Sequence, residues 1–188
     1  MKNASRGNRA AVVSGVCLGL AAVLSAGGNI FDAVFNGPLF FSLTFIVSEL
    51  MTVALPVLIL MKRKDITIVA VSFVSMILKI GPVFNNFSRE TVLNFAVDFS
   101  VFMLILYTCV PRMKSKFDIV EEYWFVPAVI TAVVAGLGCI GLFEPVDFWD
   151  VLEMVQHIAM GVLNTAGVFA LALWLKNSFE YSDEKSEC

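Results

Sequence analysis

The chain has 188 residues, of which 59% are hydrophobic and 15% charged, with a mean hydropathy of +0.84 and a formal net charge of -3. Soluble domains carry about 25% charged residues, and a soluble fold of this length could not bury so much apolar surface. Basic residues lie mainly at the ends of apolar segments, so nucleic-acid binding has no support. The composition predicts an all-α integral membrane protein in contact with the lipid bilayer.

Six apolar segments follow one another and predict six transmembrane helices in three successive hairpins. Because lipid offers no hydrogen-bond partners, each spanning segment must satisfy its own backbone as a helix. The chain is therefore expected to be a single polytopic membrane domain, residues 1–188, with a polar cytoplasmic tail over 177–188. The predicted helices cover about residues 11–35, 39–61, 66–84, 91–110, 122–143 and 149–175.

The positive charges predict the orientation, because loops rich in Lys and Arg stay in the cytoplasm. Arg89 is the one basic residue in the loops expected outside. Trp174 is expected at the inner membrane interface and Trp149 at the outer one, in agreement with this orientation. Both termini are thus predicted to be cytoplasmic, in the plasma membrane. The basic clusters expected inside fall within residues 2–9, 62–64, 112–116 and 176–185.

Ionisable side chains inside the predicted helices are the candidate functional residues. Lys79 and Asp98 lie at similar depth on consecutive helices, and His157 is expected at about the same level. Buried charges in a bilayer are costly, so they usually pair, face water or serve a function. An ion pair between Lys79 and Asp98 that only fixes helix docking remains an alternative, as does a purely hydrogen-bonded His157. The predicted ligand-binding residues are Lys79, Asp98, Glu49, His157, Asn94, Asp32 and Glu153.

Helical spacing groups these polar residues into stripes, since residues three, four, seven and eight apart share one face of a helix. Each stripe is expected to turn away from lipid, toward a polar pocket open to the outside. The stripes are Ser72, Ser75, Lys79 and Asn86; Glu90, Asn94 and Asp98; and Glu153, His157, Gly161 and Asn164.

Small residues recur at every fourth position of the first predicted helix, at Ala11, Gly15 and Gly19. This spacing lets another helix approach closely. The approaching helix could belong to this chain or to a membrane-protein partner that docks here, and the spacing alone leaves both open.

Catalytic and metal-binding patterns are missing from the sequence. The four cysteines are widely separated and His157 is the single histidine, so neither a disulfide framework nor a multi-histidine metal site is predicted. No G-x-S-x-G, H-E-x-x-H, Walker or Rossmann motif occurs. We therefore expect no metal and no cofactor, and an enzyme is not the favoured reading.

The favoured function is a small-solute-binding membrane protein, either a transporter or the substrate-binding membrane subunit of one. In helix count, orientation and the Ala11-x-x-x-Gly15 spacing, the chain resembles the substrate-binding components of energy-coupling-factor vitamin transporters. The resemblance implies six helices, a solute site near the outer face and partner docking through the first helix. A sensory or regulatory membrane module that responds to pH or a ligand is the alternative, and an intramembrane enzyme is a further one.

Overall fold

A computed structural model describes residues 2–36, 43–63, 65–85, 89–109, 125–140 and 148–186. Within these ranges the chain is entirely helical apart from short turns, which confirms the all-α prediction. The helices are α1 (Lys2–Asn36), α2 (Leu43–Leu60), α3 (Ile66–Asn85), α4 (Arg89–Cys109), α7 (Val126–Ile140) and α8 (Phe148–Ser186).

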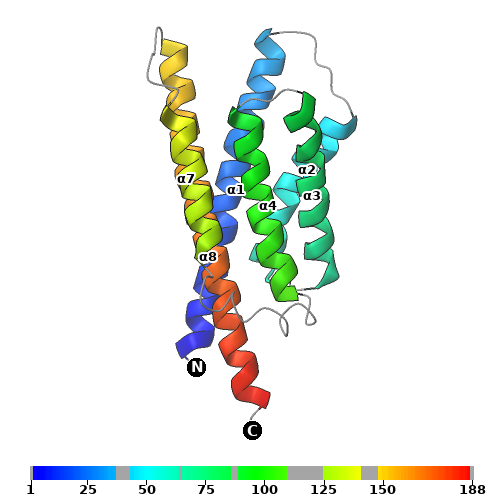
Figure 1. The fold of residues 1–188 in the computed structure, drawn as a ribbon, viewed down its shortest axis with the longest axis vertical. Coiled ribbons are helices and arrows are strands. Elements are labelled where there is room, and N and C mark those ends of the chain that lie inside the picture. Colours follow the sequence, from blue (N-terminus) through cyan, green and yellow to red (C-terminus); the bar gives the residue numbers. More distant parts are fainter. Residues whose placement is uncertain are drawn as a thin grey trace.

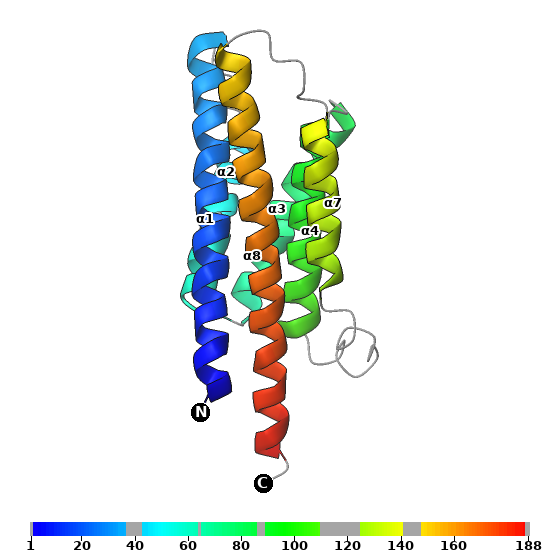
Figure 2. The ribbon, with the colours of Figure 1, turned by 90° about the vertical axis from the view of Figure 1, so that its left-hand side faces the viewer.

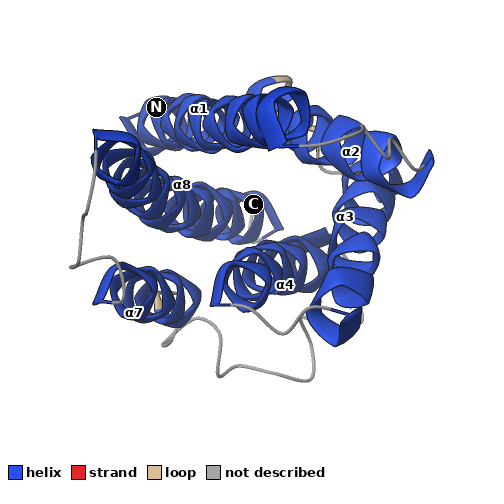
Figure 3. Ribbon diagram, turned by 90° about the horizontal axis from the view of Figure 1, so that it is seen from above, coloured by secondary structure: helices blue, strands red, loops and turns tan. Residues whose placement is uncertain are grey.

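The six described helices alternate in direction along the bundle, and both ends of the chain lie at the same end of it (Figures 1 and 2). Seen from above, α1, α2, α3, α4 and α7 follow one another around the molecule, and α8 packs against α1, α4 and α7 (Figure 3). The most extensive helix contact joins α1 to α8. The first and last helices therefore close the bundle.

Two helices extend beyond their predicted bounds. α1 begins at Lys2 instead of near residue 11, and α8 continues to Ser186 instead of ending near residue 175. The predicted tail over 177–188 is therefore helical as far as Ser186. Charged residues such as Glu and Lys end an apolar span, but they are good helix formers, and no Gly or Pro interrupts residues 177–186.

Two stretches of the described chain are long and apolar enough to cross a membrane, Asn8–Gly27 and Asp150–Lys176. Shorter apolar helical stretches lie in the other four helices. These are Leu50–Leu60, Ile66–Ile80, Phe95–Leu106 and Val126–Leu137.

The described surface is rich in large apolar side chains, and several hydroxyl groups lie inside. Ser72, Ser100 and Thr131 are buried and donate to backbone carbonyls of their own helices. Trp174 is only 3% exposed and belongs to the core, so its ring packs inside the bundle, and its level at the inner membrane interface stays a prediction. Exposed apolar residues occur on every described helix, including Val16, Leu20, Val53, Val57, Phe73, Ile77, Phe99, Met103, Val129, Val133, Val155 and Val162.

α2 ends at the predicted basic cluster through a well-defined cap. Lys62 adopts a left-handed conformation, with φ of 56°. Its N–H donates to the carbonyl of Ile59 at 2.8 Å, and the N–H of Arg63 donates to the carbonyl of Leu58 at 3.0 Å. This pair of bonds is the Schellman arrangement, which satisfies carbonyls left open at a helix end. The chain can therefore turn directly into α3.

The small-residue face of α1 is covered by α2. A Cβ added to Gly15 would lie 2.5 Å from Cγ of Leu60 and 3.1 Å from the carbonyl oxygen of Pro56. Gly19 also faces Pro56, and Ala11 is completely buried. Within the chain, α2 therefore packs against Gly15 and Gly19, and docking of a partner through this face stays a prediction.

Candidate polar cavity

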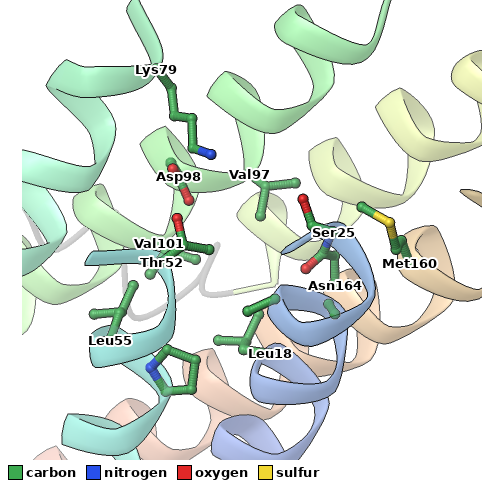
Figure 4. A pocket seen from close by; sticks show the side chains of 13 residues that line it. Leu18, Ser25, Thr52, Leu55, Lys79, Val97, Asp98, Val101, Met160 and Asn164 are labelled. Carbon is green, nitrogen blue, oxygen red and sulfur yellow. The ribbon is translucent and has the colours of Figure 1, made fainter. Parts of the chain in front are cut away.

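A cavity of about 50 Å³ lies in the middle part of the bundle, between five of the six described helices (Figure 4). α1, α2 and α8 provide most of its apolar wall, and α3 and α4 provide one charged side chain each. The lining residues are Leu18, Ala21, Ala22, Ser25, Thr52, Leu55, Pro56, Lys79, Val97, Asp98, Val101, Met160 and Asn164.

The two charges come from neighbouring helices, as their sequence positions predict. Lys79 on α3 and Asp98 on α4 are both half-buried, and Figure 4 shows the Lys79 ammonium group on the same side of the cavity as the Asp98 carboxylate. Ser75 lies one helical turn before Lys79 and is only 1% exposed. Its Oγ donates a hydrogen bond of 3.0 Å to Oδ2 of Asp98. This bond fixes the carboxylate at the α3–α4 interface.

Lys79 and Asp98 both line the cavity, and the Asp98 carboxylate has a partner on α3 in Ser75. Within the described ranges the recorded ion pair joins Arg63 to Asp65, whose side chains are 48% and 42% exposed. A hydrogen bond from Ser75 to Asp98 joins α3 to α4 beside the cavity.

Polar groups also reach the cavity from the other side of the bundle. Ser25 of α1 and Asn164 of α8 lie close together, across the cavity from Lys79 and Asp98 (Figure 4). Thr52 of α2 lies near the Asp98 side. The cavity thus combines one cation, one carboxylate, two hydroxyls and one amide among its described lining residues.

The structure does not place His157 and Glu153 among the residues described as lining the cavity. Glu153 is exposed, and the half-buried His157 has its Nδ1 2.9 Å from the carbonyl oxygen of Glu153 on its own helix. Gln156, which the sequence analysis did not select, donates from Nε2 to the carbonyl of Leu24 at 2.9 Å and so joins α8 to α1. The side chains of Glu49, Asn94 and Asp32 lie outside the described residues.

Eleven of the thirteen lining residues were not among the predicted ligand-binding residues, and the three polar ones and Met160 are the most informative of them. Asn164 had a usable signal, because it lies on the polar stripe that also contains His157. Ser25, Thr52 and Met160 had none, since isolated hydroxyl and thioether side chains are ordinary packing residues of membrane helices. A pocket assembled from five helices brings such residues together in a way that no single helix reveals.

A larger groove of about 880 Å³ lies between α7 and α8. Ala128, Ala132 and Gly136 of α7 contribute to its wall, and Thr165 donates its hydroxyl to the carbonyl of Gly161 on its own helix. The described lining contains no charged residue. The groove therefore lacks the groups that would orient a polar solute, and the smaller cavity is the better candidate site.

The volume and the lining limit what the smaller cavity can hold. One water needs about 10–15 Å³ measured in this way, so the cavity has room for roughly three to five water-sized groups. Organic ligand pockets usually measure about 300–1,000 Å³. As it stands, the cavity fits a very small polar solute or a few waters, and it is too small for a molecule of vitamin size.

Comparisons with known proteins add no relative: no protein-family model, no curated protein and no solved structure matches the chain. The resemblance to vitamin-transporter components therefore still depends on helix count, predicted orientation and the spacing on α1.

Proposed function

We propose that the chain is a membrane protein of six transmembrane helices, with both termini in the cytoplasm, and that its central cavity binds a small polar solute from the outside. It acts as a transporter or as the substrate-binding membrane subunit of one. The observation that supports the solute site is the cavity wall, because Lys79 of α3 and Asp98 of α4 both line one small space.

The pattern of burial supports the membrane part of the proposal. Large apolar side chains are exposed on all six described helices, whereas five Ser and Thr side chains are buried. Soluble monomers rarely expose large contiguous apolar patches. In a bilayer the same side chains contact lipid. Four of the five buried hydroxyls bond to helix carbonyls or to another helix, and the exception is Ser14.

The charges of the described chain support the orientation, because the basic residues at the start of α1, just after α2 and near the end of α8 lie toward the end of the bundle that holds both termini (Figures 1 and 2). The predicted basic cluster over 112–116 lies outside the described residues. In that orientation Lys79 lies in the half of α3 nearer to the outside. A solute entering from outside would therefore reach the Lys79 side of the cavity first.

Mass spectrometry of solutes that co-purify with the protein tests the proposed site. The wild-type protein, Lys79→Met and Asp98→Asn would be purified in mild detergent alongside Lys62→Met, a charge change at an exposed position outside the cavity. We expect a solute held by the wild type and by Lys62→Met, and lost from both cavity variants. A wild-type protein that retains no solute and binds none from a small-metabolite panel would refute the proposed function.

A further inference from the structure

Resting on this proposed function, we infer that the solute is a compact zwitterion of the amino-acid type, no larger than about glycine. Its carboxylate binds the ammonium group of Lys79, and its ammonium group binds the carboxylate of Asp98. The inference follows from the signs, the arrangement and the volume of the groups around the cavity.

Opposite charges on one wall select against simple ions. An inorganic or organic anion attracted by Lys79 meets the carboxylate of Asp98 in the same small space, and a cation attracted by Asp98 meets Lys79. Repulsion between like charges is strong where little water is present. A zwitterion satisfies both groups at once, since each of its ends meets the opposite charge.

The hydrogen-bonding capacity at each end suits the same ligand. Ser75 donates to Oδ2 of Asp98, and an ionised carboxylate has about four acceptor sites, so a bond to an ammonium ligand does not require Asp98 to lack other partners. Across the cavity, Ser25 and Asn164 present a hydroxyl and an amide, which can donate to a carboxylate oxygen or accept from an ammonium group. These neutral groups orient the solute without adding a net charge.

The apolar wall sets the size limit. Val101 is 2% exposed and Met160 is 8% exposed, and both close the space around the polar groups. Room for roughly three to five water-sized groups matches glycine and leaves no space for a large side chain. A bulky amino acid such as leucine should therefore be rejected by contact with the wall.

Equilibrium binding of radiolabelled glycine to the purified, lipid-reconstituted protein tests this inference. Unlabelled glycine, acetate, methylamine and leucine serve as competitors. We expect glycine to compete at least about tenfold better than acetate or methylamine, which each keep only one of the two charge-assisted bonds. Leucine should not compete. In the Met160→Ala variant, whose cavity is larger, free alanine added as a competitor should compete better relative to glycine than it does in the wild type.

Two variants assign the ends of the ligand. In Lys79→Met, glycine should no longer compete better than methylamine. In Asp98→Asn, glycine should no longer compete better than acetate. Lys62→Met should leave both advantages of glycine unchanged. Acetate or methylamine competing as well as glycine would overturn the inference. So would a co-purified solute of another class that is lost from Asp98→Asn, and that result would leave the proposed solute-binding function intact. Absence of any bound solute would refute both.

Discussion

Ser75 on α3 donates a hydrogen bond of 3.0 Å to Oδ2 of Asp98 on α4. Ser75 precedes Lys79 on α3 by one helical turn. The bond lies at the edge of the cavity and joins two helices through a charged acceptor. It therefore links the docking of α3 and α4 to the position of the carboxylate that we propose binds the solute.

Replacing Ser75 with alanine should destabilise the protein by about 1 kcal/mol, because interhelical hydrogen bonds in membrane bundles contribute on average about 0.6 and at most about 1.7 kcal/mol. Ser72 provides a matched control, since it is equally buried but donates to the carbonyl of Val69 on its own helix. Unfolding in mixtures of mild detergent and dodecyl sulfate measures both variants. Equal losses in the two variants would contradict an interhelical role for Ser75.

The contact between α1 and α8 depends on the lack of a side chain at Gly167. A Cβ at this position would lie 2.7 Å from Cγ of Leu18, a residue that is only 7% exposed and has little room to move. Overpacking of this kind costs about 1–3 kcal/mol, so Gly167→Ala should destabilise the bundle by that amount. The unfolding midpoint in detergent is the measurement.

Gly136 is the control for this substitution, because an added Cβ there has no neighbour within 4 Å. Gly136→Ala should be neutral or stabilising by up to about 1 kcal/mol, through the higher helix propensity of alanine. Combining Gly167→Ala with Leu18→Ala should recover part of the loss and reveal coupling of about 0.5–3 kcal/mol. Strictly additive effects would show that the two residues do not clash.

The order of the six described helices could be predicted because each apolar run is long and bounded by charges or turn residues. α3 illustrates this: the predicted range was 66–84, and the helix covers Ile66–Asn85. The ends of α1 and α8 could not be predicted in the same way. Charged residues mark where an apolar segment stops, but the backbone continues as a helix because those residues favour it.

Lys79 and Asp98 could be placed on one cavity because depth and helical face together fix where two side chains on adjacent helices lie. His157 satisfied the face criterion but not the depth. The α8 residues that line the cavity are Met160 and Asn164, which follow His157 by three and seven residues, or roughly 5 and 10 Å along the helix. Predicting that difference requires the offset between α8 and α3, which is set by side-chain packing across the bundle.

Val133 tests whether the exposed apolar surface contacts lipid. It lies in the middle of α7 and is 55% exposed. An arginine at the centre of a membrane helix costs about 2.5–3.5 kcal/mol, so Val133→Arg should sharply reduce membrane insertion. On a surface in water the same change would alter stability by no more than about 0.5 kcal/mol.

Met61→Arg is the matched control, because Met61 is also apolar and 63% exposed but lies beside Lys62 just after the end of α2. Arginine is tolerated at that level, where its side chain can reach the headgroups. The amount of carbonate-resistant membrane protein measures both variants. Equal insertion of Val133→Arg and Met61→Arg would contradict a lipid-facing α7.

The two predicted sides of the membrane can be assigned with single cysteines. In a protein that retains only Cys188, a membrane-impermeant maleimide should fail to label intact cells and should label them after permeabilisation, because the C-terminus is predicted to be cytoplasmic. A second protein without native cysteines but with Ser88→Cys, in the turn predicted outside, should be labelled in intact cells. Mass shift on a gel measures both.

The two single-cysteine proteins distinguish an inverted orientation from a wrong number of spans, because six spans place residues 88 and 188 on opposite sides of the membrane. Labelling of Cys188 in intact cells with protection of Ser88→Cys would mean that the orientation is inverted, and Lys79 would then lie in the inner half of the bundle. Labelling of both positions would mean that the number of spans between them is even, contrary to the three predicted after residue 88. In either case the proposed entry of the solute from the outside, past Lys79, would no longer follow from the position of this lysine on α3.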